Sequence, residues 1–206
     1  MNETTNLIFA GVGGQGVLLA AELTALAAVR AGHDVKQTEV HGVSQRGGSV
    51  ESHVRFGPEV HSPLVMAGQA DVVFGLEKLE ALRFAPYLRL HPCEGSKPSQ
   101  GSAAGILLVN EHEIVPASVA GAAEKYPYRA LDFLREKGMR VVAVPASQRA
   151  RELGDGRMAN IVLLGALSAL IDLPGQVWLD TLRDGVPAKY WEANLRAFEI
   201  GRGLGA

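Results

Sequence analysis

Two glycine-rich stretches hold the residues of this sequence that are best suited to chemistry. The first, GVGGQG, follows the apolar residues 7–10, and its candidate ligand-facing members are Gly11, Gly13, Gly14, Gln15 and Gly16. Glycines permit a tight turn and a close backbone approach, and the amides that open a following helix attract anions. The stretch fits G-x-G-x-x-G between a strand and a helix, so it predicts a turn that holds a phosphate of a dinucleotide or of another cofactor.

Three alternatives bear on this first stretch. A P-loop is excluded because Val17 and Leu18 stand where Lys and Ser/Thr are required. A nicotinamide site would use an acidic residue after the second strand, and Glu39 stands at about the right distance. The glycines could also serve packing alone, by letting the strand and the helix approach closely.

The second stretch is HGVSQRGGSV, in which the candidate residues are Gln45, Arg46, Gly47 and Gly48. Arginine binds carboxylates and phosphates with two parallel hydrogen bonds, and the adjoining glycine amides could form an anion nest. A hairpin entry with a solvated arginine is the structural alternative. Loops that follow parallel strands reach the same sheet edge, so we expect the two stretches to lie side by side.

The elements around these loops alternate between strand and helix. Strands are expected at 7–10, 35–40, 71–75, 106–110 and 140–145. Helices are expected at 17–31, 76–88, 128–138 and 157–173, and one or two more over 177–201. We expect an α/β fold: a single Rossmann-like three-layer domain over residues 1–206, with a mostly parallel sheet and helices on both faces. One antiparallel ribbon is expected around residues 49–65, with 59–65 returning beside 49–56, and residues 91–104 should form an exposed loop insertion.

Composition excludes several classes of function. The 206 residues have a net charge of −2 and are 47% hydrophobic, so neither nucleic acid nor an acidic membrane surface is an expected partner. The single Cys93 excludes a cysteine-ligated iron–sulfur cluster held by this chain alone, and the scattered histidines predict no metal site. No apolar run reaches the length of a membrane span, and no targeting segment is visible, so the sequence predicts a soluble cytoplasmic protein. Asn160 is expected either to bond a neighbouring backbone group or to line a pocket.

Together, GVGGQGV and EVHGVSQRGGSV resemble the gamma-type domain of the 2-oxoacid:ferredoxin oxidoreductases. The form HGVSQRGGSV with VRFG is most similar to the beta subunits of the indolepyruvate:ferredoxin oxidoreductases. The resemblance continues through SPLVMAGQADVVFGLEKLEALR, NIVLLGAL and NLRAFEIGR, and it covers nearly the whole chain. The departure is residues 91–104, where a shorter link is expected.

The resemblance implies a subunit of an oxidoreductase that converts aryl-2-oxoacids to aryl-acetyl-CoA and reduces ferredoxin. Thiamine diphosphate, Mg and the [4Fe-4S] clusters would belong to a larger alpha subunit, and this chain would be inactive alone, with no catalytic residue of its own. Its two glycine stretches would face coenzyme A or the alpha subunit. The alternatives are a gamma subunit of a pyruvate or 2-oxoglutarate enzyme, a nicotinamide-binding oxidoreductase, and a free-standing nucleotide-binding module.

Overall fold

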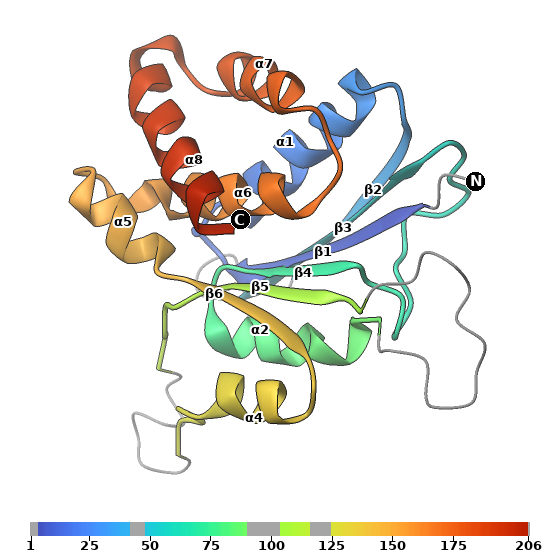
Figure 1. The fold of residues 1–206 in the computed structure, drawn as a ribbon, viewed down its shortest axis with the longest axis vertical. Coiled ribbons are helices and arrows are strands. Elements are labelled where there is room, and N and C mark those ends of the chain that lie inside the picture. Colours follow the sequence, from blue (N-terminus) through green and yellow to red (C-terminus); the bar gives the residue numbers. More distant parts are fainter. Residues whose placement is uncertain (1–3, 42–47, 90–103, 116–124, 206) are drawn as a thin grey trace.

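A computed structural model of the chain describes residues 4–41, 48–89, 104–115 and 125–205. Its centre is a six-stranded sheet in the order β2-β3-β1-β4-β5-β6 (Figure 1). The strands are β1 (Thr5–Val12), β2 (Asp34–His41), β3 (Ser49–Gly57), β4 (Val72–Gly75), β5 (Ile106–Asn110) and β6 (Arg140–Val144). All run parallel except β3, which lies antiparallel between β2 and β1. The predicted α/β class with a mostly parallel sheet is confirmed.

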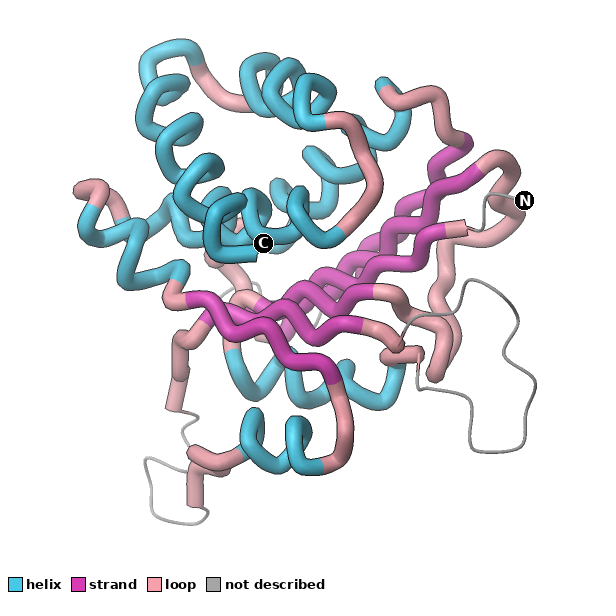
Figure 2. The backbone as a smooth tube through the Cα atoms, in the orientation of Figure 1, coloured by secondary structure: helices cyan, strands magenta, loops and turns pink. Residues whose placement is uncertain are grey.

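Helices cover both faces of the sheet (Figure 2). One layer contains α1 (Val17–Arg30), α5 (Ala146–Glu152), α6 (Ala159–Leu170), α7 (Gly175–Gly185) and α8 (Trp191–Gly205), and the other contains α2 (Lys78–Phe84) and α4 (Ala130–Glu136). Three short 3₁₀ helices, η1 (Ala85–Tyr87), η2 (Gly156–Met158) and η3 (Ala188–Tyr190), connect them. The three-layer arrangement follows from the sequence pattern, because buried parallel strands need a helix layer on each face.

Alternate residues of the central strands feed two separate cores. In β1, Leu7 and Phe9 face the α1 layer, while Ile8 and Ala10 face the α2 layer. The strands β4 and β5 alternate in the same way, and Phe74 lies against Phe9 with 4.9 Å between the ring centres. Each strand therefore reads as a continuous apolar run, and the sheet is anchored from both sides.

The residues after β3 correct one expectation. Residues 59–65 do not return as a strand, because both edges of β3 are already paired, with β1 and with β2. The segment is irregular, and side chains of β3 hold it. The guanidinium of Arg55 donates to the Ser62 carbonyl at 2.9 Å, and Nδ1 of His53 accepts the Val65 amide at 3.0 Å.

Glycines set the spacing between α6 and α8. A Cβ built on Gly201 would lie 1.7 Å from the carbonyl oxygen of Val162, and one built on Gly165 would lie 2.0 Å from that of Phe198. The two backbones are therefore in direct contact. This close packing brings α8 down onto α6 and fixes the position of the α6 amino end, which lies beside the first glycine stretch.

Candidate functional site

The first glycine stretch forms the turn between β1 and α1. Gly14 and Gly16 have φ of 97° and 80°, which are left-handed values that glycine adopts without strain. Gly14 is exposed, and no atom lies within 4 Å of a Cβ built on it. The turn therefore leaves open space above Gly14, where a ligand or another chain can approach the backbone.

Close packing requires glycine at two positions of the turn, Gly11 and Gly16. A Cβ on Gly11 would lie 2.8 Å from Gln15 Oε1 and 2.8 Å from Val17 Cγ2. A Cβ on Gly16 would lie 2.4 Å from Asn160 Nδ2. At these two positions the glycines let the strand, the turn and α6 pack closely, as the packing alternative proposed.

Gln15 and Asn160 fasten the turn from inside. Oε1 of Gln15 accepts the Val12 amide at 2.8 Å, and its Nε2 donates to the Leu76 carbonyl at 3.4 Å. Asn160 is buried, and its Nδ2 donates to the Gly16 carbonyl at 3.3 Å. Asn160 thus bonds a backbone group, and it also lines a pocket, so both expectations for this residue are confirmed. Gln15 is a brace that connects the turn with the residue after β4.

The amino end of α1 carries no capping side chain. Gly16 is the N-cap and supplies no side-chain acceptor, and the first turn holds no acidic residue. The first amides of a helix have no acceptor within the helix, and the helix dipole adds partial positive charge there. The helix begins at Val17, three residues after Gly14, at the carboxyl edge of the sheet.

The second stretch meets the first at this edge. The Gly13 amide donates to the Gly48 carbonyl at 2.9 Å, so the ends of the two loops are in direct contact. Gln45, Arg46 and Gly47 lie outside the described residues. The expected proximity of the loops is therefore confirmed through Gly13 and Gly48.

A cavity of about 200 Å³ lies beside the turn, and we call it the carboxyl-edge pocket. The residues that follow β1, β4, β5 and β6 line it: Gly14, Gln15, Leu76, Asn110, His112, Ser147, Gly156, Arg157 and Ala159. Asn110, which is buried, donates to the Leu76 carbonyl at 3.1 Å and to Ser147 Oγ at 2.8 Å. Sequence reasoning missed this network, although a single polar residue at the end of the apolar run ILLVN was its signal.

Arg157 is the cation at the mouth of the pocket. Its guanidinium contacts Asp155 Oδ2 at 2.6 Å and remains 83% exposed. This hydrogen bond lowers the pKa of Asp155 to about 2. An exposed pair of this kind adds little to stability, so Arg157 can exchange Asp155 for another anion at small cost.

Glu77 fixes the segments around the far side of the pocket. This buried carboxylate accepts the Glu80 amide at 2.9 Å, the Ile114 amide at 3.1 Å and the Tyr126 hydroxyl at 3.2 Å. Burial and the nearby Glu77 raise the pKa of Tyr126. With three donors satisfied, Glu77 is a structural residue that ties α2 to the chain after β5.

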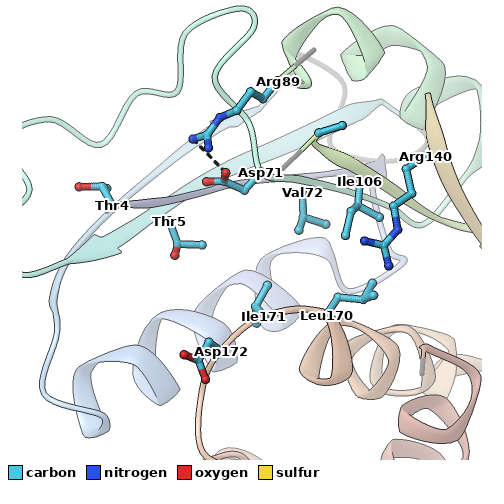
Figure 3. A pocket seen from close by; sticks show the side chains of 11 residues that line it. Thr4, Thr5, Asp71, Val72, Arg89, Ile106, Arg140, Leu170, Ile171 and Asp172 are labelled. Atoms are coloured by element: carbon cyan, nitrogen blue, oxygen red, sulfur yellow. Dashed lines mark ion pairs between the residues drawn. The ribbon is translucent and has the colours of Figure 1, made fainter. Parts of the chain in front are cut away.

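A second pocket lies at the opposite, amino edge of the sheet (Figure 3). Asp71 is its central carboxylate; it pairs with Arg89 at 2.9 Å and accepts the Asn6 amide at 2.8 Å. Asp71 therefore joins the starts of β1 and β4. We assign Asp71 a structural role, since its carboxylate is committed to the sheet.

The position of β3 weakens the nicotinamide alternative. Glu39 lies on β2, and β3 separates β2 from β1. Neighbouring strands are spaced by about 4.8 Å, which puts β2 roughly 10 Å from the strand that carries the glycine turn. Gln37 Nε2 approaches Glu39 Oε1 at 3.5 Å. In the dinucleotide fold the acidic residue follows the strand adjacent to β1, so Glu39 is one strand too far away.

Among the described residues, no three His, Cys, Asp or Glu side chains are grouped so that they could hold a metal ion. Within that part of the chain, no helix has the length and apolar character needed to cross a bilayer.

Comparison with known proteins places the chain among enzyme subunits. Residues 6–204 match the family described as pyruvate ferredoxin/flavodoxin oxidoreductase. The indolepyruvate oxidoreductase subunit IorB of Thermococcus kodakarensis is 38% identical over 203 residues, which are 95% of this chain and 93% of that protein.

Solved structures share the fold at lower identity. The gamma subunit of a keto/oxoacid ferredoxin oxidoreductase from Geobacter sulfurreducens superposes with a TM-score of 0.68 at 23% identity, over 98% of each chain. The 2-oxoglutarate:ferredoxin oxidoreductase of Magnetococcus marinus, solved with 2-oxoglutarate, coenzyme A and succinyl-CoA, superposes with a TM-score of 0.72 at 22% identity. That match covers 100% of this chain and 31% of the longer Magnetococcus chain.

Proposed function

Because the chain belongs to the pyruvate ferredoxin/flavodoxin oxidoreductase family, we propose that it is a subunit of an indolepyruvate:ferredoxin oxidoreductase. The observation that carries this proposal is the 38% identity to an indolepyruvate oxidoreductase subunit across 95% of the chain. The complex would convert an aryl-2-oxoacid to the aryl-acetyl-CoA and pass the electrons to ferredoxin in the cytoplasm.

The reacting cofactors belong to a partner subunit in this proposal. One cysteine is too few for a [4Fe-4S] cluster, which needs four thiolates. Thiamine diphosphate, when bound in the alpha subunit, supplies the carbanion stabilisation that decarboxylation requires. This chain would contribute a surface that faces that site.

The carboxyl edge is the surface that we assign to coenzyme A. Its donors suit a phosphate: the uncapped amino end of α1, the open backbone at Gly14, and Arg157. Gly11, Gly13, Gly16 and Gln15 would hold the turn in shape, and Gly48 would fix the second loop against it. Gln45, Arg46 and Gly47 enter the proposal from the sequence alone, as a cation and an anion nest.

Reconstitution tests the proposed function. The purified chain alone should show no turnover, and addition of the thiamine-dependent alpha subunit should give 2-oxoacid-dependent reduction of a viologen dye in the presence of coenzyme A. Indolepyruvate should be preferred over pyruvate and 2-oxoglutarate in kcat/KM. Preference for pyruvate or 2-oxoglutarate would assign the chain to another branch of the family, and activity of the chain alone with NAD would refute the proposal.

Arg46→Ala tests the role of the second loop. The loss of a charge-assisted contact of about 1.5–3 kcal/mol should lower kcat/KM for coenzyme A by roughly 10- to 100-fold. The melting temperature of the isolated chain should not change. Arg151→Ala, which removes an exposed arginine of α5, is the matched control and should leave both values unchanged. Equal losses of activity and stability in Arg46→Ala would mean that Arg46 is structural.

A further inference from the structure

A groove with an apolar floor lies next to the carboxyl-edge pocket, where Leu19 of α1 meets η2, the amino end of α6 and the η3–α8 segment. Its volume is about 430 Å³, and its apolar lining residues are Leu19, Leu153, Met158, Ile161, Tyr190 and Ala193. We call it the Leu19 groove. Met158 and Ile161 form a buried floor, whereas Leu19 and Tyr190 stand at the rim with 36% and 44% of their surfaces exposed.

The groove is continuous with the candidate site. Arg157 lines both the groove and the carboxyl-edge pocket. Asn160, a further lining residue, donates to the carbonyl of Gly16 in the glycine turn. A protein segment bound in the Leu19 groove would therefore contact Asn160, which holds the glycine turn, and Arg157, which lines the carboxyl-edge pocket.

The chemistry of the groove suits a protein surface. Buried apolar residues lie at its centre, and Tyr190, Asn194 and the Arg157–Asp155 pair lie at its rim. Interface centres are depleted of charge, and tyrosine and arginine are the residue types that most often dominate binding energy there. Because Met158 and Ile161 at its centre carry no charge, the floor of the groove favours an apolar segment.

The comparison with the Magnetococcus enzyme indicates which protein would occupy the groove. There, the fold of this chain accounts for 31% of a longer polypeptide, so the neighbouring parts are joined to it covalently. A separate chain of the same fold needs a noncovalent interface in place of that connection. We propose that the Leu19 groove is the docking site for an apolar segment of the thiamine-dependent alpha subunit, an inference that rests on the proposed function.

The α1 helix offers a matched pair of substitutions. Leu19 and Leu26 are on the same helix and have similar exposures of 36% and 42%, but Leu26 does not line the groove. Binding of the purified chain to the alpha subunit would be measured by titration. Leu19→Asp should raise the Kd at least about 10-fold, and Leu26→Asp should leave it unchanged. Tyr190→Ser, which alters an exposed residue, should raise the Kd in the same way without a change in melting temperature.

The outcomes are distinguishable. If the wild-type chain binds and all three variants bind equally well, the groove is not the docking site, although the proposed function stands. If Leu26→Asp weakens binding as much as Leu19→Asp does, the contact is not specific to the groove, and the inference fails. If the wild-type chain does not bind the alpha subunit, the proposed function fails with it. A dimer of the isolated chain that Leu19→Asp dissociates would assign the groove to a second copy and overturn the proposal.

Discussion

At Gly16 the backbone conformation and the neighbouring side chain both exclude a larger residue. The φ of 80° is strained for an L-residue, and an added Cβ would lie 2.4 Å from Asn160 Nδ2. Gly16→Ala should therefore lower the free energy of unfolding by about 2–4 kcal/mol, measured by urea denaturation. Gly14→Ala has the same sign of φ but no atom within 4 Å, so its loss should be only about 1 kcal/mol. Equal losses would show that Asn160 moves aside without cost.

His53 should make stability depend on pH. Its Nδ1 accepts the Val65 amide, its Nε2 is buried without a hydrogen-bond partner among the described residues, and Glu51 Oε1 lies 3.8 Å from that Nε2. Burial lowers the pKa of His53. The folded state therefore favours the neutral ring, and stability should fall as the pH drops below the ordinary histidine pKa of about 6.5 towards the lowered value.

His53→Asn isolates this contribution. The amide oxygen of asparagine can accept the Val65 amide but does not titrate, so the loss of melting temperature between pH 7 and pH 5 should be smaller than in the wild type. The Tyr87 ring lies 6.3 Å from the His53 ring, and Glu80 and Arg83 of α2 act on Glu51. Burial raises the pKa of Glu51, so this carboxyl makes stability rise as the pH falls through its own, more acidic, range. The variant retains Glu51 and therefore retains this pH dependence of stability. Identical pH profiles would refute the role of His53.

At the scale of elements, the contact between α6 and α8 depends on the absence of side chains. An alanine at Gly201 would place its Cβ 1.7 Å from the Val162 carbonyl oxygen and would force the helices apart. Gly201→Ala should therefore destabilise the chain by at least about 3 kcal/mol in urea denaturation. Gly203, two residues later in the same helix, has no atom within 4 Å, so Gly203→Ala should stabilise the chain by up to about 1 kcal/mol. The same sign of effect in both variants would contradict this packing.

Most elements could be predicted from the sequence, because their signals are local. The glycine end of α1 is an example: Gly32 has φ of 88°, and the His33 amide closes the helix onto the Ala28 carbonyl at 3.1 Å. The pairing of β3 could not be predicted, because alternation of side chains does not say which strands are neighbours. The expected return strand at 59–65 was wrong for that reason. The short helix α5, with the polar sequence ASQRARE, gave no apolar periodicity to detect.

At the scale of the whole molecule, assembly should change the protection of one surface. Hydrogen exchange of the isolated chain and of its complex with the alpha subunit would be compared by mass spectrometry. The amides of the first turn of α1 and of 156–161 should exchange more slowly in the complex, because they border the carboxyl-edge pocket and the Leu19 groove. The α4 helix, in the opposite layer, is the internal control. Protection confined to α4 would place the partner on the opposite face of the sheet and would contradict this prediction.

The candidate site was predictable where one short segment builds it and not where distant segments meet. The glycine turn and its proximity to Gly48 followed from the motif and the topology. The internal bonds of Gln15 were not foreseen, because its partner Leu76 comes from another strand. The Asn110–Ser147 contact joins residues 37 positions apart and depends on the register of β5 and β6. Neither contact has a signature in any single stretch of residues.

The insertion of β3 between β1 and β2 constrains how the chain can fold during synthesis. The α1 helix joins β1 and β2, yet the two strands have no ladder in common. Both pair with β3, and β1 pairs with β4 on its other edge. The ribosome therefore releases β1 and β2 before it has made β3, the strand that lies between them in the sheet. The amino-terminal strand–helix–strand unit is incomplete until Gly57 has emerged, so nascent chains that end before this residue should be open to proteases.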